Sequence, residues 1–236
     1  MSHFWASADR WGVSRAAAIL LNALAIGAVP VLAALFFLDR QAFRVVLNED
    51  GVVEWAQVLL WAASGAVGAW IAAERFRSGY RGQAILWIGF GLAALVLAGE
   101  ELSWGQRLLD LETPKVLEEI NRQDEINLHN IGRTLTVFNI ALFIASAYAI
   151  AAEWIQRRWN IVGRFADGDR LYVPPFFLAG LFAIMVGYRF VRWVILNQES
   201  YALTSLSEWA EVCFAGALFI TVFLSARWLS RRARDA

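Results

Sequence analysis

The chain has 236 residues, of which 59% are hydrophobic and only 18% are charged, and its mean hydropathy is +0.49. Soluble domains average roughly 45–50% apolar and about 25% charged residues, so this composition predicts a membrane protein. The 21 basic residues balance 21 acidic ones, which excludes a bulk electrostatic attraction to nucleic acid. One cysteine, Cys213, and two histidines, His3 and His129, exclude a disulfide framework and the multi-histidine sites of haem-copper, zinc and desaturase-type membrane enzymes.

Six apolar stretches are long enough to cross a bilayer core, which requires about 20 residues in a helix that rises about 1.5 Å per residue. In chain order they cover residues 16–38, 53–73, 84–106, 134–156, 174–195 and 204–230. We therefore predict an all-α membrane protein, with residues 1–236 forming one integral membrane domain of six transmembrane helices. Six crossings place both termini on one side, and the loops of that side carry most of the basic residues. By the positive-inside rule, the termini are expected in the cytoplasm.

The second and sixth predicted spans begin with similar segments. Glu-Trp-Ala-Gln-Val at 54–58 corresponds to Glu-Trp-Ala-Glu-Val at 208–212, and an arginine followed by a Leu-Asn pair precedes each of them. Spans one and two would then be repeated in parallel orientation as spans five and six, as in transporter folds whose binding sites lie where the repeats meet. The alternative is a chance similarity between short apolar segments.

Several acidic residues are predicted at the ends of the spans that lie opposite the termini. Ionisable side chains inside a membrane are costly, and they mark either function or a buried pair. Glu54 with Gln57, and Glu208 with Glu211, are three residues apart, so each pair shares one face of its helix.

The third predicted span ends with Glu100 and Glu101. These two side chains lie about 100° apart around a helix, so one can face the bundle centre while the other contacts a neighbouring element. The loop that follows, residues 108–133, contains an amphipathic stretch at 113–120 with a proline in its first turn. This pattern favours a short helix lying on the outer membrane surface as a lid.

Three motifs lie around this loop: Gly-Glu-Glu-Leu-Ser-Trp-Gly-Gln-Arg at 99–107, Glu-Thr-Pro at 112–114 and Asn-Leu-His-Asn at 127–130. The combination resembles a motif set of bacterial integral membrane proteins that have no assigned activity. The resemblance implies a bacterial protein of the inner membrane, and it implies no reaction or substrate.

Three kinds of function fit these residues. A carboxylate-rich site suits Ca²⁺, Mg²⁺ or Mn²⁺, whereas a di-iron centre is not expected because Gln57 and Glu211 stand where such centres place histidine. Haem is not expected either. Acid/base catalysis on a lipid or lipid-linked molecule is the second possibility, since clustered carboxylates in a low dielectric cannot all ionise. The third is a structural network of glutamates and arginines in an accessory or assembly subunit that binds a partner protein.

The leading hypothesis is a membrane-embedded enzyme or binding protein for a lipid-like molecule, with membrane lipid as its partner and no nucleic acid. The candidate catalytic residues are Glu100, Glu101 and His129. The candidate residues for binding the substrate or an ion are Glu54, Gln57, Glu208, Glu211 and Asn127.

Overall fold

The computed structural model describes residues 3–48, 51–109, 111–118, 126–127, 131–196 and 200–235, and its regular elements in these ranges are helices. The long helices are α2 (Arg15–Leu38), α4 (Val52–Arg77), α5 (Arg81–Glu101), α8 (Gly132–Trp159), α10 (Ala179–Phe190) and α11 (Tyr201–Asp235). The short elements are α1 (His3–Trp11), α3 (Arg40–Leu47), η1 (Ser103–Gly105), α6 (Gln106–Leu109), α7 (Lys115–Glu118), α9 (Gly168–Leu171), η2 (Phe176–Leu178) and η3 (Val191–Ile195).

Within the described residues, six helical stretches are long and apolar enough to cross a membrane. They coincide in order and position with the six predicted spans, which confirms the all-α membrane fold. Large apolar side chains lie on the outside of these helices, such as Phe37 and Leu38 at 81% and 84% exposed. A surface this apolar is suited to contact with lipid tails, and the fold is that of a multi-pass membrane protein.

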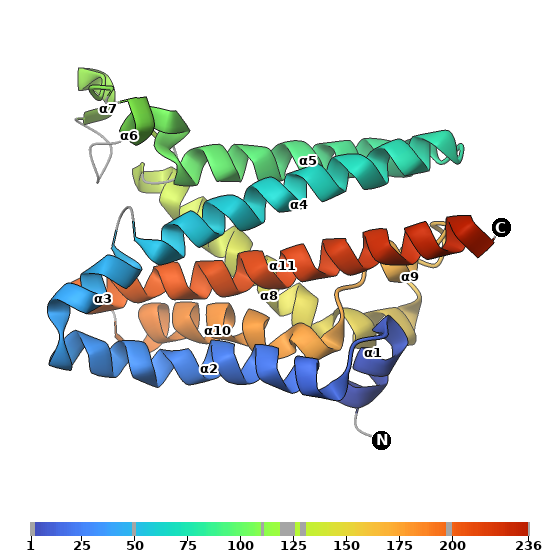
Figure 1. Cartoon of the computed structure of the whole chain (residues 1–236), viewed down its shortest axis with the longest axis horizontal. Coiled ribbons are helices and arrows are strands. Elements are labelled where there is room, and N and C mark those ends of the chain that lie inside the picture. The colour runs from blue at the N-terminus through green and yellow to red at the C-terminus, as the bar shows by residue number, and fades with distance from the viewer. Residues whose placement is uncertain are drawn as a thin grey trace.

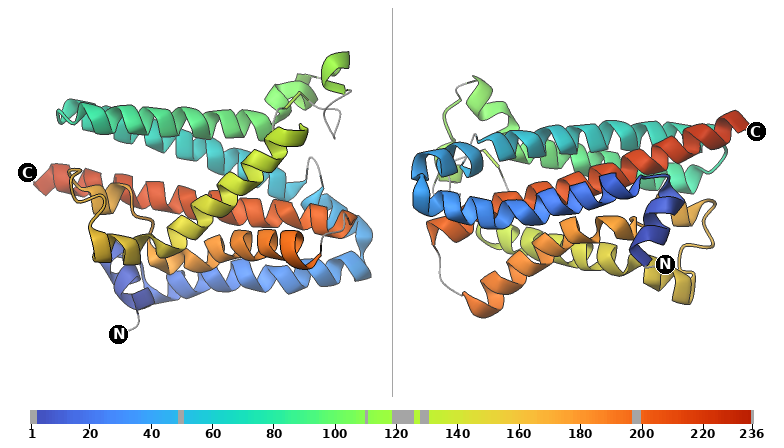
Figure 2. Two further views of the ribbon diagram at one scale, coloured as in Figure 1. Left: turned by 180° about the vertical axis from the view of Figure 1, so that it is seen from behind. Right: turned by 60° about the horizontal axis from the view of Figure 1, so that its bottom comes forward.

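Helix α11 runs through the middle of the bundle, with α4 on one side of it and α10 on the other (Figure 1). Helix α5 packs chiefly on α4, and α2 packs on α10. Helix α8 crosses the bundle obliquely, as Figure 2 shows. Both chain ends lie with α1, α9 and the α4–α5 turn at what we call the terminal end. The opposite end, where α4 and α11 begin and α5 finishes, is called the acidic end.

Local sequence explains several of these boundaries. Ser14 caps α2 by accepting a hydrogen bond from the Ala17 amide at 3.2 Å. Asp39 caps α3, because its carboxylate accepts hydrogen bonds of 3.0 Å from two amides of the first turn. Such caps satisfy amides that the helix itself leaves unpaired. Close packing of α5 on α4 depends on Gly65 and Gly91, since a Cβ at Gly91 would lie 3.3 Å from the Gly65 carbonyl oxygen.

Three boundaries differ from the prediction. The third span was expected to reach residue 106, but α5 ends at Glu101 because the next residues turn into the left-handed region. The fifth span is not one α-helix, since α10 is flanked by the 3₁₀-helix η2 and the π-helical turn η3. The helix expected at 113–120 is described only as the single turn α7, at Lys115–Glu118. Most of the remainder of the loop lies outside the described residues.

Candidate functional site

The predicted acidic residues of three helices gather at the acidic end. Glu54 lies in the first turn of α4, Glu101 is the last residue of α5, and Glu208 and Glu211 lie near the start of α11. Glu101 is buried, with 6% of its surface exposed. Its carboxyl group interacts electrostatically with those of Glu211, Glu208, Glu54 and Glu100. The structure therefore brings together the five glutamates that the sequence singled out.

Two of these carboxylates are held by side chains of neighbouring helices. The amide Nε2 of Gln57 on α4 donates a hydrogen bond of 2.9 Å to Oε2 of Glu208 on α11. A guanidinium nitrogen of Arg189 on α10 lies 2.9 Å from Oε1 of Glu211. Gln57 and Arg189 are themselves buried, so these contacts fasten α4 and α10 to the central helix.

Glu100 is held within its own segment. The indole Nε1 of Trp104 donates a hydrogen bond of 2.7 Å to Oε1 of Glu100. This contact requires a sharp turn after α5, in which Ser103, Trp104 and Gly105 all have positive φ. It also requires Gly99, because a Cβ there would lie 3.0 Å from the Trp104 ring. Non-glycine residues in this backbone region are strained, and such strain concentrates at functional sites.

Part of the loop folds back onto this turn. The Gln106 side chain donates a hydrogen bond of 2.6 Å to the Thr113 hydroxyl, and its carbonyl oxygen accepts one of 2.6 Å from the Ile126 amide. Asn127 is buried and donates to the Ser103 hydroxyl at 3.4 Å. Asn127 therefore contacts the turn that follows Glu101, and its proposed binding role stays a prediction. His129 lies outside the described residues, so its proposed catalytic role stays a prediction.

Glu101 differs from Glu100, Glu208 and Glu211 in its hydrogen-bond partners. Among the residues that the structure describes, none donates a hydrogen bond to the Glu101 carboxyl group. A buried carboxyl group without donors is costly. It is therefore the member of the group best placed to meet a ligand that brings hydrogen-bond donors or positive charge.

The arrangement of these carboxylates bears on the metal hypothesis. In the described part of the chain, no three Asp, Glu, His or Cys side chains are placed to hold one ion together. A hard divalent cation takes six or more oxygen ligands. Gln57 already donates a hydrogen bond to Glu208, and Arg189 forms an ion pair with Glu211. The described side chains therefore provide no preformed site for Ca²⁺, Mg²⁺ or Mn²⁺.

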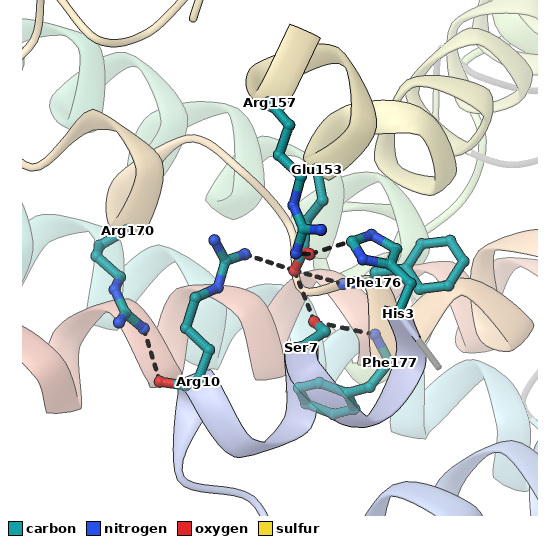
Figure 3. A network of polar contacts seen from close by, with 8 residues as sticks. All are labelled: His3, Ser7, Arg10, Glu153, Arg157, Arg170, Phe176 and Phe177. Atoms are coloured by element: carbon teal, nitrogen blue, oxygen red, sulfur yellow. Dashed lines mark hydrogen bonds and ion pairs between the residues drawn. The ribbon is translucent and has the colours of Figure 1, made fainter. Parts of the chain in front are cut away.

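A second polar network, at the terminal end, was missed in the sequence. Glu153 of α8 is only 1% exposed, and it lies between α1 and the start of η2 (Figure 3). It accepts hydrogen bonds from the Ser7 hydroxyl at 2.6 Å and the Phe176 amide at 3.1 Å. Arg10 forms an ion pair with it at 2.6 Å, and His3 lies 3.4 Å away. His3 is the first residue of α1.

The signal that could have revealed this network is the position of Glu153 in the apolar stretch Ala-Ala-Glu-Trp-Ile at 151–155. Such a residue requires partners, and the only basic residue one turn away, Arg157, lies 3.8 Å from it. Apart from the Phe176 amide, the remaining partners come from the first ten residues, which the sequence gives no reason to place beside α8.

No protein-family model, curated protein or solved structure matches this chain. The fold therefore defines the class, which is a multi-pass membrane protein, and its helix bundle has a polar network at each end.

Proposed function

We propose that this multi-pass membrane protein binds the polar head of a lipid-like molecule at its acidic end, with Glu101 as the central contact. The observation that carries the proposal is the burial of Glu101 among four other carboxylates, with no described donor. A head group that supplies an ammonium or several hydroxyls would satisfy this group, and its apolar tail would remain in the surrounding bilayer. Glu54, Gln57, Glu208, Glu211 and Asn127 would then surround the head group.

The chemistry available to such a ligand is proton exchange. A buried carboxyl group can act as a general acid or base when a reacting atom comes within hydrogen-bond reach. Glu100, Glu101 and His129 are the groups that we assign to this step, should the bound molecule be turned over. Segment 108–133 would cover the site from the aqueous side.

Amphiphile binding to the purified protein tests this proposal. We would measure the melting temperature with an alkyl amine, an alkyl glycoside and an alkyl phosphate of equal chain length. The amine and the glycoside should stabilise the wild type, and the phosphate should not. In Glu101→Gln, the affinity for the amine should fall about tenfold or more, because a charge-assisted hydrogen bond contributes about 1.5–3 kcal/mol.

The matched control is Glu74→Gln, which makes the same change at a partly exposed glutamate of α4 near the terminal end. It should bind the amine as the wild type does. Equal stabilisation of the wild type and Glu101→Gln by the amine would contradict the proposal.

A second candidate function is structural, and the Gln57–Glu208 and Arg189–Glu211 contacts favour it. In that case the glutamates fix the helix bundle of an accessory or assembly subunit. Glu101→Gln would then change the melting temperature without any amphiphile, no head group would be preferred, and a partner protein should co-purify in mild detergent.

The proposal also places the chain in a bacterial inner membrane with its acidic end outward. Ser78 and Glu112 are exposed residues at opposite ends of the bundle. In intact cells, an impermeant thiol reagent should label Glu112→Cys and not Ser78→Cys. The reverse pattern would contradict this orientation.

A further inference from the structure

An apolar cavity of about 360 Å³ lies between α5, α8, α10 and α11. Its volume falls in the range of roughly 300–1,000 Å³ that is usual for small-molecule sites. Its walls include the rings of Phe90, Phe182 and Phe214. The proposed head-group site is at the acidic end, whereas this cavity reaches Tyr172, next to α9 at the terminal end. The two sites are therefore separate.

Two hydrogen-bond donors in the cavity wall lack an acceptor of full hydrogen-bond geometry among the residues that the structure describes. The indole Nε1 of Trp87 and the hydroxyl of Tyr172 are buried, and neither makes a hydrogen bond within the described part of the chain. Their rings stack at 6.2 Å between centroids. The Trp87 indole N–H interacts with the Tyr172 hydroxyl, but the contact does not have the full geometry of a hydrogen bond. Leaving such a donor unsatisfied costs about 1–3 kcal/mol. An oxygen acceptor at this position would remove the cost.

The same end of the cavity carries a surplus of positive charge. Arg75, which is 3% exposed, interacts electrostatically with the Tyr172 hydroxyl. Its buried Nε has no hydrogen-bond partner among the described residues. Its guanidinium lies 2.8 Å from the Asp167 carboxylate. Arg232 pairs with the same carboxylate. Glu74 also attracts Arg75, but its ion pair is with Arg77, so three arginines share two carboxylates. An anionic group is the complement of this arrangement.

We propose that the cavity holds an acyl chain of an anionic phospholipid. The ester oxygen at the head of the chain would accept hydrogen bonds from Trp87 and Tyr172, and the phosphate would lie near Arg75 and Arg232. The apolar walls would enclose the chain itself. This is a lipid site distinct in place and in charge from the acidic end.

Native mass spectrometry of the purified, delipidated chain tests the proposal. Phosphatidylglycerol and phosphatidylcholine with identical acyl chains would be titrated separately, so that only the charge of the head group differs. The wild type should retain phosphatidylglycerol more strongly. Equal retention of the two lipids would overturn the proposal.

Two variants locate the binding. Tyr172→Phe removes one donor and keeps the ring, so the affinity for phosphatidylglycerol should fall about threefold to tenfold. Ala145 is an exposed residue that lines the cavity, and Ala145→Trp should fill it and abolish the preference. The control Ala141→Trp places the same bulk one turn earlier on α8, at an exposed residue outside the cavity wall. It should bind as the wild type does.

The melting temperature of each variant without lipid shows whether the fold is kept. Retention of phosphatidylglycerol by a folded Ala145→Trp at the wild-type level would overturn the location. A loss in Ala141→Trp as large as that in Ala145→Trp would overturn it as well.

Discussion

Gln57 on α4 donates a hydrogen bond to Glu208 on α11, and these two residues belong to the two similar Glu-Trp-Ala segments of the chain. Each segment lies near the start of its helix at the acidic end, and the two helices run side by side in the same direction (Figure 1). The two similar segments therefore meet each other directly. A Gln at 57 and a Glu at 211 are the one difference within the five-residue segments. That difference allows an amide on one segment to donate to a carboxylate on the other.

Exchanging the two polar groups tests this contact. Gln57→Glu alone would place a second carboxylate against Glu208 and should destabilise the protein by about 1–3 kcal/mol, because a partly buried acceptor loses its donor. The combination with Glu208→Gln restores one donor and one acceptor and should recover most of that loss. Thermal unfolding of the two variants in detergent measures the difference. No recovery in the double variant would show that Gln57 and Glu208 do not act as a pair.

The contact between α2 and α10 depends on a glycine. The Asn22 side chain donates hydrogen bonds of 2.8 Å to the carbonyls of Ala18 and Phe177. A Cβ at Gly180 would lie 2.1 Å from the Asn22 side-chain oxygen. We expect Gly180→Ala to displace Asn22 and to lower the free energy of unfolding by about 2–3 kcal/mol.

Gly187 provides the control within the same helix, because a Cβ there would meet no atom within 4 Å. Gly187→Ala should be neutral, or stabilising by up to about 1 kcal/mol through its helix propensity. Thermal unfolding of both variants gives the comparison. Equal melting temperatures for Gly180→Ala and Gly187→Ala would contradict the close approach.

The order and positions of the six spans were predictable because a bilayer imposes length and apolarity on every crossing helix. Where the prediction failed, the cause is local backbone geometry. Nothing in the apolarity of residues 84–106 indicates that Ser103 and Trp104 adopt positive φ. Helix α3 could have been predicted from Asp39, a good cap residue directly before it.

The gathering of glutamates at the acidic end was also predictable, because helix direction and position along the chain place Glu54, Glu101 and Glu208 at one depth. Their individual partners were not predictable. Which of two adjacent residues, Glu100 or Glu101, reaches the Trp104 indole depends on the rotation of α5. The position of Arg189 opposite Glu211 depends likewise on how α10 packs against α11.

Glu153 should control the docking of the N-terminal helix. Glu153→Gln removes the ion pair with Arg10, and the Ser7 hydroxyl then donates to an uncharged, weaker acceptor (Figure 3). We expect the free energy of unfolding to fall by about 3 kcal/mol. This is near the lower end of the cost of breaking a buried ion pair, because Arg10 is partly exposed. Protease cleavage before residue 15 should become faster. The control is Glu74→Gln, whose ion pair with Arg77 is longer, at 3.5 Å, and partly exposed. It should cost less than about 1 kcal/mol, and unchanged cleavage in Glu153→Gln would refute the docking role.

The ion pair of Arg189 and Glu211 is a test of whether the acidic end is structural throughout. Both side chains are largely buried, so Arg189→Met leaves an unpaired carboxylate and should destabilise the bundle by about 3–5 kcal/mol. Adding Glu211→Leu removes that charge, and apolar replacement of both partners should return the stability close to that of the wild type. Thermal unfolding gives the stabilities, and amphiphile binding is measured on the same samples. A folded double variant that still distinguishes the alkyl amine from the alkyl phosphate would separate the structural role of Glu211 from the binding role of Glu101. A double variant as unstable as Arg189→Met would contradict the pairing.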